Sequence, residues 1–195
     1  MAHELTLDAE TKEWLSCHYK YLSGTILEYG SGGSTILALK SNPNNFVFTC
    51  ETDPLWLESV AADAEASHVS ERLIKVYTDI GATKEWGYPT CFSAKLLNAS
   101  TRGWEVLRES KKHPGFVLID GRFRVGCFLS TLVNCEKHVQ LLWDDWEGRS
   151  HYHVIEDIIK PTRLIGRAAL FDVPPNILSA RALAAFWLPF FLDPA

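Results

Sequence analysis

Four acidic residues stand at the ends of short apolar runs, where a carboxylate can bind a ligand or accept a proton. Glu28 follows "TIL", Glu51 ends "NFVFTCE", Asp79 ends "RLIKVYTD", and Asp120 follows "FVLI". Carboxylates at such positions can accept hydrogen bonds from sugar hydroxyls or act as general bases. One such acid has an ordinary explanation as a helix cap or a solvated group, but four together predict a shared site.

A glycine-rich turn, "EYGSGGS", follows the first of these acids. Glycine lets the backbone approach a ligand closely and adopt conformations that other residues resist. A dinucleotide-binding turn of the form GxGxxG would use Gly30 and Gly32 and would need a third small residue at position 35. That position is Thr35, and Gly33 is out of phase, so the pattern disfavours a dinucleotide without removing it.

This turn resembles the first motif of the class I S-adenosylmethionine-dependent methyltransferases, an acid followed by Gly-x-Gly; the family often has a third glycine where this chain has Ser34. The resemblance covers roughly residues 22–173 and implies S-adenosylmethionine as cofactor. It places an acid near the cofactor's ammonium group, a second acid at the ribose hydroxyls and a third at the adenine. The cofactor-binding residues expected are Glu28, Tyr29, Gly30, Ser31, Gly32, Ser34, Glu51, Thr52, Asp79, Ile80 and Asp120.

Methyl transfer from a sulfonium is an in-line displacement, so the protein mainly aligns the acceptor and can remove its proton. Asp120 is the expected catalytic residue, as base, acceptor anchor or metal ligand. Catechol-type O-methyltransferases hold a metal with an acid after the fourth strand and an Asp-Asn pair after the fifth. That pattern matches Asp120, Asp144 and Asp145, except that Asp145 stands where the family has Asn. A divalent metal is therefore an alternative that is not favoured.

Two further pairs have both a functional and an ordinary interpretation. His151 and His153 form an HxH pair suited to a transition metal or a general base, although packed or helix-capping histidines are commoner. Arg122 and Arg124 can hold an anionic acceptor, or they pair with nearby acids, which is the more frequent outcome.

These residues must be positioned by strands that alternate with helices, the pattern of a parallel sheet covered on both faces. Strands are expected at 24–30, 45–51, 72–79, 115–121 and 138–145, with an antiparallel edge pair within 162–173. Helices are expected at 8–21, 34–41, 54–67, 91–110, 122–135 and 152–160. Together with the resemblance, this predicts an α/β fold, Rossmann-like, with a mostly parallel seven-stranded sheet. We expect one domain over residues 1–195.

Two segments have less regular patterns. The stretch 79–92, "DIGATKEWGYPTCF", contains two glycines and a proline, and either packs over the sheet edge or covers a ligand. The apolar C-terminal segment, about 176–195, is too short and interrupted to span a membrane. We expect it to pack on the core or on a neighbouring subunit. In the second case the protein would be a homo-oligomer. Exposed Trp187, Phe190 and Phe191 would instead suit a partner surface.

Composition limits the partners. The formal net charge is −5, and the sequence contains no run of lysine and arginine, which argues against nucleic acid as a partner. The N-terminus lacks an export signal, and the five scattered cysteines are typical of reduced thiols, so we expect a cytoplasmic protein.

The sequence thus predicts an S-adenosylmethionine-dependent methyltransferase acting at oxygen or nitrogen of a small-molecule acceptor. A non-catalytic binding module with the same fold is the alternative, because fold does not fix function. A nicotinamide-dependent oxidoreductase is a weaker alternative.

Overall fold

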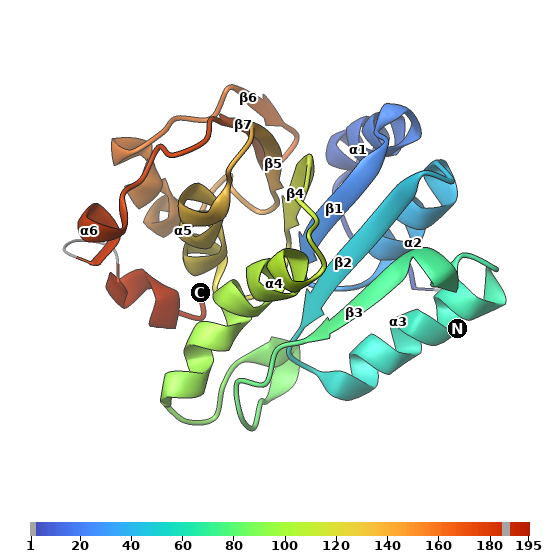
Figure 1. The fold of residues 1–195 in the computed structure, drawn as a ribbon, viewed down its shortest axis with the longest axis horizontal. Coiled ribbons are helices and arrows are strands. Elements are labelled where there is room, and N and C mark those ends of the chain that lie inside the picture. Colours follow the sequence, from blue (N-terminus) through green and yellow to red (C-terminus); the bar gives the residue numbers. More distant parts are fainter. Residues whose placement is uncertain (1–2, 185–187) are drawn as a thin grey trace.

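A seven-stranded sheet forms the centre of the computed structural model, which describes residues 3–184 and 188–195 (Figure 1). The strand order is β3-β2-β1-β4-β5-β7-β6. Strands β1 to β5 are parallel, whereas β7 pairs antiparallel with β5 and with β6. The bounds are β1 Gly24–Tyr29, β2 Asn45–Glu51, β3 Leu73–Tyr77, β4 Phe116–Ile119, β5 Val139–Trp143, β6 Arg163–Ile165 and β7 Ala168–Val173. The predicted α/β sheet is confirmed, including its antiparallel edge pair.

The pairing register brings the carboxyl ends of the central strands to one edge of the sheet. Tyr29, the last residue of β1, lies opposite Cys50 of β2 and Ile119 of β4. Ile119 in turn lies opposite Trp143, the last residue of β5. The loops that leave these strands therefore start side by side, as expected for a ligand site in an open parallel sheet.

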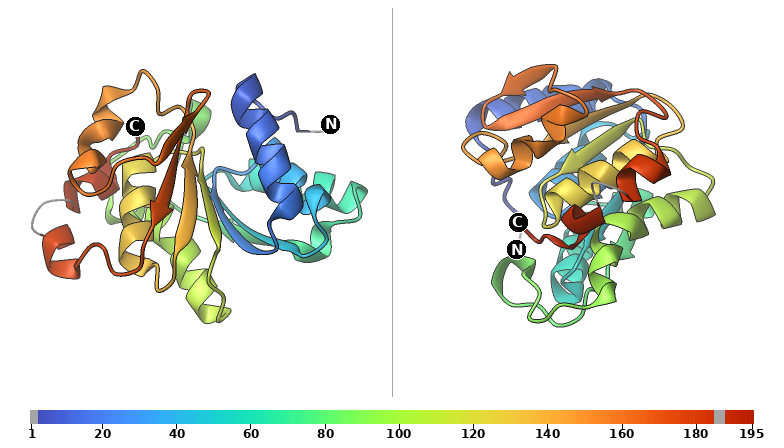
Figure 2. Two further views of the ribbon diagram at one scale, coloured as in Figure 1. Left: turned by 90° about the horizontal axis from the view of Figure 1, so that it is seen from above. Right: turned by 90° about the vertical axis from the view of Figure 1, so that its left-hand side faces the viewer.

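Helices cover both faces of the sheet (Figure 2). One face packs against α1 Ala9–Tyr21, α2 Gly33–Ser41 and α3 Pro54–Ala66. The other packs against α4 Asn98–Glu109 and α5 Arg124–Asn134. The strands between them are nearly continuous apolar runs because both faces are buried.

Side-chain caps fix where two helices begin. Asp8 accepts hydrogen bonds from the backbone N–H groups of Glu10 and Thr11 at the start of α1. Asp53 does the same for α3, with Pro54 as the first helical residue. Each cap satisfies N–H groups that have no partner inside the helix. The second cap lies only two residues after the end of β2, so it also shapes the loop at the site.

Two predicted helices differ from the observed elements. The helix expected at 91–110 is α4 alone, preceded by a 3₁₀ turn at Ala94–Leu97 that Lys95 and Asn98 tie to Asp79. The helix expected at 152–160 is a 3₁₀ helix at Ser150–Asp157. Its buried residues, Tyr152 and Ile155, are three apart, the spacing that a 3₁₀ helix places on one side.

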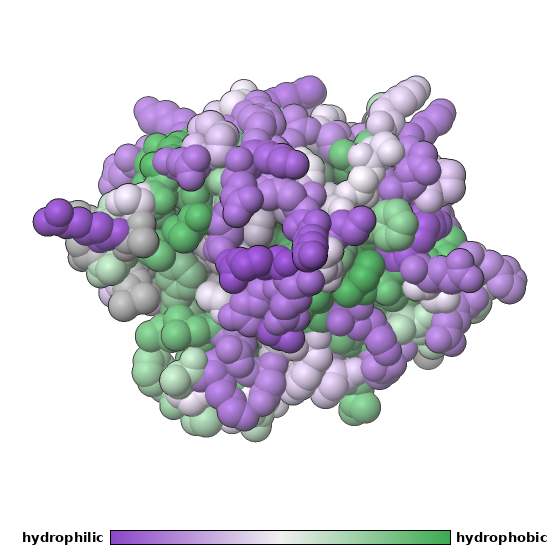
Figure 3. Space-filling model, in the orientation of Figure 1, coloured by the Kyte–Doolittle hydropathy of each residue, from purple (hydrophilic) through white to green (hydrophobic). Residues whose placement is uncertain are grey.

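Within the described residues, the C-terminal segment includes two short helical elements, α6 Ala180–Ala182 and a 3₁₀ helix at Leu188–Leu192. Phe191 is buried against α5, where a Cβ on Gly126 would come within 3.0 Å of the Phe191 Cα. The expected exposure of Phe191 is therefore wrong, and Trp187 lies outside the described residues. Hydrophobic residues gather on the side of the molecule where α5 and this segment lie (Figure 3). No helix within the described residues is long and apolar enough to cross a membrane.

Candidate functional site

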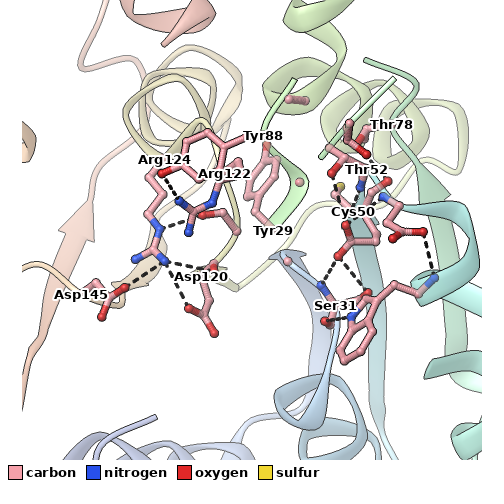
Figure 4. A pocket seen from close by; sticks show the side chains of 18 of the residues that line it. Tyr29, Ser31, Cys50, Thr52, Thr78, Tyr88, Asp120, Arg122, Arg124 and Asp145 are labelled. Carbon is pink, nitrogen blue, oxygen red and sulfur yellow. Dashed lines mark hydrogen bonds and ion pairs between the residues drawn. The ribbon is translucent and has the colours of Figure 1, made fainter. Parts of the chain in front are cut away.

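A cavity of about 1080 Å³ opens at the carboxyl ends of β1, β2, β4 and β5 (Figure 4). Its walls come from the loops that leave these strands, from the 79–92 stretch and from Arg167 in the β6–β7 turn. This volume slightly exceeds the usual range of about 300–1,000 Å³ for small-molecule sites.

Two glycines bring the backbones of β1 and β4 together at the cavity. Gly30 has φ +96°, and a Cβ there would lie 2.7 Å from the backbone nitrogen of Gly121. A side chain at position 30 would therefore be strained and would also collide with the neighbouring chain. Both glycines line the cavity, as does Tyr29.

Glu28 lies behind the glycine turn and not on the cavity wall. Its side chain is completely buried and accepts hydrogen bonds from the hydroxyls of Ser34 at 2.5 Å, Thr35 at 2.5 Å and Thr49 at 2.7 Å. Burial raises the pKa of Glu28 to about 7, and the three hydroxyls partly offset that effect. Thr35 also accepts a hydrogen bond from the Gly32 N–H, so the residue that departs from the dinucleotide pattern holds this turn.

Glu51 lies on the cavity wall, with both carboxylate oxygens fixed by the surrounding backbone. One oxygen accepts from the N–H groups of Thr52 at 2.7 Å and Asp53 at 3.0 Å. The other accepts from the N–H and the hydroxyl of Ser31, both at 3.2 Å. The structure thus brings together Ser31, Glu51 and Thr52, three of the residues predicted to bind the cofactor.

Asp79 and Ile80 do not line the cavity. The Asp79 carboxylate bonds to Lys95 at 2.7 Å and to the Gly81 N–H at 2.9 Å, and the hydrogen bond with Lys95 holds the Asp79 pKa below its usual value. Ile80 is buried in the core. Thr78, just before them, lies on the wall instead.

Asp120 lies on the cavity wall beside a buried arginine. The guanidinium of Arg124 is 3.5 Å from the Asp120 carboxylate and donates to the carbonyl oxygens of Asp120, Gly121 and Asp144. Burial, followed by repulsion from the Asp144 carboxylate, raises the pKa of Asp120 to about 8, although Arg124 acts in the opposite direction. Its side chain is still 23% exposed, so its carboxyl group can reach a ligand.

Asp144 and Asp145 are bound by arginines. Arg167 donates to the two oxygens of the fully buried Asp144 at 3.0 and 2.7 Å. Asp145 pairs with Arg149 at 2.8 Å and with Arg124 at 3.2 Å. No group of His, Cys, Asp and Glu within residues 3–184 and 188–195 is arranged to hold a metal ion. Guanidinium groups occupy the sides of these acids that a cation would need, so this set does not fit the metal alternative.

The HxH pair lies away from the cavity. His153 stacks on Trp146 with ring centroids 4.6 Å apart, and its Nδ1 is 3.2 Å from Glu156. His151 is exposed and packs against Tyr152. Neither histidine lines the cavity, which favours the ordinary packing interpretation.

The 79–92 stretch forms a lid over the cavity, which we call the lid loop. A 3₁₀ turn at Glu85–Gly87 brings Gly87, with φ +73°, against both sides of the cavity mouth. A Cβ there would lie 2.9 Å from the Thr52 hydroxyl and 3.6 Å from the Arg122 Cγ. Arg122 also donates to the Tyr88 hydroxyl at 2.9 Å. The position of this stretch at the cavity therefore favours the ligand-covering alternative over simple packing at the sheet edge.

Several wall residues were not predicted from the sequence. Arg167 arrives through the β6–β7 turn, and Thr6 belongs to the segment before α1. Trp56 donates to the Ser31 carbonyl at 2.8 Å from the first turn of α3. Only Arg167 had a usable clue, since a residue at the tip of an antiparallel pair next to β5 must lie near the end of that strand.

Comparison with known proteins matches nearly the whole chain to a solved structure. No protein-family model and no curated protein matches the sequence. The chain is 34% identical to a methyltransferase-like protein of Silicibacter pomeroyi, with 99% of both chains covered and a TM-score of 0.87.

Two more distant structures share the fold. An O-methyltransferase from Bacillus cereus in complex with SAH is 16% identical over 97% of this chain and 71% of that one, with a TM-score of 0.55. The O-methyltransferase TomG from Streptomyces achromogenes in complex with SAM is 16% identical over 82% and 63% of the chains, with a TM-score of 0.52.

Proposed function

The chain belongs to the class I S-adenosylmethionine-dependent methyltransferase family, and from this premise we propose that it methylates an oxygen or nitrogen atom of a small-molecule acceptor. The observation that carries the proposal is the position of Glu51 beside Ser31 and Thr52 on the wall of the cavity.

The residues on this wall fit a nucleoside with an amino acid tail. A carboxylate at the end of the second strand is suited to accept ribose hydroxyls. Of the donors that surround Glu51, the hydroxyls of Ser31 at 3.2 Å and Thr52 at 3.4 Å can rotate away and free a lone pair for a ligand, whereas the backbone N–H groups cannot. Glu28 contributes indirectly, because its three hydrogen bonds hold the turn that carries Ser31. Bound S-adenosylmethionine supplies an electrophilic methyl group on a sulfonium.

Asp120 is the group that we propose to accept a proton from the acceptor. In Figure 4 it lies across the cavity from Ser31 and Thr52, which bond to Glu51. Its pKa of about 8 makes the carboxylate a stronger base than an ordinary aspartate. The ionised form grows as the pH rises through about 8, so methyl transfer that depends on it should increase over the same range. Tritium transfer from labelled cofactor to an acceptor should therefore be lost in Asp120→Asn at every pH.

Calorimetric titration with S-adenosylhomocysteine tests the cofactor site. We expect binding to the wild type and at least a tenfold loss in Glu51→Ala, since a hydrogen bond to a charged group contributes about 1.5–3 kcal/mol. Glu58→Ala is the control, because Glu58 is exposed on α3, away from the cavity, and its carboxylate bonds to Lys75. NAD serves as the control ligand. If the wild type bound neither compound, the non-catalytic binding module would replace this proposal; binding of NAD alone would favour the oxidoreductase.

Further expectations stay predictions. They are the single domain, the cytoplasmic location, a homo-oligomer formed through the C-terminal segment, and the absence of a nucleic-acid partner.

A further inference from the structure

Arg122 differs from the other arginines of the cavity wall. Arg124, Arg149 and Arg167 each form ion pairs with aspartates. Arg122 is half-buried on the same wall, and its guanidinium has no acidic partner among the residues that the structure describes. A guanidinium that is partly removed from water without a counter-ion is unfavourable, so it is suited to an anion brought by a ligand.

Tyr88 completes this position. Its hydroxyl oxygen accepts a hydrogen bond from Arg122 at 2.9 Å, and the guanidinium lies 5.0 Å from the centre of the Tyr88 ring. Because the oxygen acts as acceptor in that bond, the hydroxyl proton remains available to a second acceptor. The guanidinium fork and this proton can therefore point toward one oxyanion.

The rest of the wall places this pair on the acceptor side of the cavity. Arg122 follows Asp120 by two residues, and Figure 4 draws Arg122 and Tyr88 on the side of Asp120 and Asp145, across from Ser31 and Thr52. A ligand bound there would have its anionic end at Arg122 and its reacting atom toward Asp120.

We propose that Arg122 and Tyr88 form a carboxylate-binding subsite, and that the methyl acceptor is a small molecule carrying a carboxylate group. This inference rests on the proposed function and specifies its substrate class. The guanidinium would bind the carboxylate in two parallel hydrogen bonds, and Tyr88 would add a third from the lid loop. Acceptor binding would thereby hold the lid loop closed over the site.

The test uses benzoate and benzamide, which have the same shape but differ in charge. Both are titrated into protein saturated with S-adenosylhomocysteine, while the Arg122 side-chain Nε–H is followed by NMR in ¹⁵N-arginine-labelled protein. We expect benzoate to shift this resonance and to bind roughly tenfold tighter than benzamide. Arg122→Met should abolish the preference and leave S-adenosylhomocysteine affinity within about twofold, whereas Tyr88→Phe should weaken benzoate by about threefold.

Two results would overturn the inference. Equal or absent binding of benzoate and benzamide, with S-adenosylhomocysteine still bound, would remove the subsite and leave the proposed function intact. The cofactor's own carboxylate would be the occupant if Arg122→Met weakened S-adenosylhomocysteine but not 5′-methylthioadenosine, which lacks the amino acid tail. Failure of the wild type to bind S-adenosylhomocysteine would instead be a failure of the proposed function.

Discussion

Glu28 supports the site without facing it. Its carboxylate is enclosed by the hydroxyls of Ser34, Thr35 and Thr49, which belong to α2 and β2. The acid of the glycine motif therefore joins the turn to the two neighbouring elements, and its protonation affects the free energy of unfolding.

Glu28→Gln should change how stability depends on pH. The folded-state pKa of Glu28 is raised to about 7 from 4.5, so the folded protein binds the proton more tightly than the unfolded chain. The associated stabilisation is fully present below pH 4.5 and is lost as the pH rises through about 7, up to about 3 kcal/mol. Urea unfolding between pH 5 and 8 should show this decrease for the wild type and not for the variant.

A surface glutamate gives the control for that measurement. Glu65 is exposed on α3, so Glu65→Gln should follow the wild-type pH dependence. A parallel decrease in Glu28→Gln would show that other groups cause it.

Individual residues could be assigned to strand ends from the sequence more readily than their contacts could. Six of the eleven residues expected to bind the cofactor line the cavity, namely Tyr29, Gly30, Ser31, Glu51, Thr52 and Asp120. The other five, Glu28, Gly32, Ser34, Asp79 and Ile80, do not line it. Successive side chains of a strand point to opposite faces, and a loop can turn a side chain back, so closeness to a strand end does not give direction. The hydroxyls around Glu28 come from α2 and β2, two segments that no local sequence pattern connects.

The lid loop is the element whose position most directly controls access to the cavity. Both Gly81 and Gly87 have positive φ, but only at Gly87 would a Cβ meet the cavity mouth. Backbone strain should therefore be similar in Gly81→Ala and Gly87→Ala. A collision with Thr52 is expected in Gly87→Ala alone, so the two variants form a matched pair.

Gly87→Ala should displace the lid loop. We expect faster amide hydrogen exchange over residues 79–92 and S-adenosylhomocysteine binding weakened by roughly tenfold, as for loss of about 1.4 kcal/mol. Gly81→Ala should show only the strain, near 1 kcal/mol in unfolding free energy, with little loss of affinity. Similar affinities in the two variants would mean that contact at Gly87 does not shape the site.

Strands and helices could be predicted from the sequence where a single hydrophobic periodicity extended over the whole segment. Five buried strands read as apolar runs because helices cover both faces of the sheet. The 3₁₀ helix at Ser150–Asp157 was predicted as α-helix because both types bury residues at similar spacing. The tie of Lys95 and Asn98 to Asp79, which shapes the start of α4, joins residues 16 and 19 positions apart and leaves no periodic trace.

Across the whole molecule, Arg167 joins the antiparallel edge to the centre of the sheet. It is bonded to Asp144 at the end of β5 and to the carbonyl of Thr6 before α1. Asp144 is fully buried, so its charge depends on this arginine. The pKa of Arg167 is raised, first by its hydrogen bond with Asp144, which is consistent with a strong pair.

Arg167→Met should destabilise the protein by about 3–5 kcal/mol, because it leaves a buried carboxylate without its partner. Arg149→Met should cost less than about 1 kcal/mol, since Arg149 is a more peripheral partner of Asp145. Urea unfolding measures both changes. Adding Asp144→Asn to Arg167→Met should recover part of the loss, and equal costs for the two single variants would contradict this assignment.

The hydrogen bonds between the start of α1 and the antiparallel edge pair have a consequence for synthesis. Thr11 donates to the Ile165 carbonyl across 154 positions, and the Arg167 N–H donates to Asp8 across 159. A ribosome adds about 5–20 residues each second, so residues 6–11 wait roughly 8–30 s for these partners to be made. During that time α1 can pack only on what has already emerged, and its hydrogen bonds to Ile165 and Arg167 form only after those residues have been made.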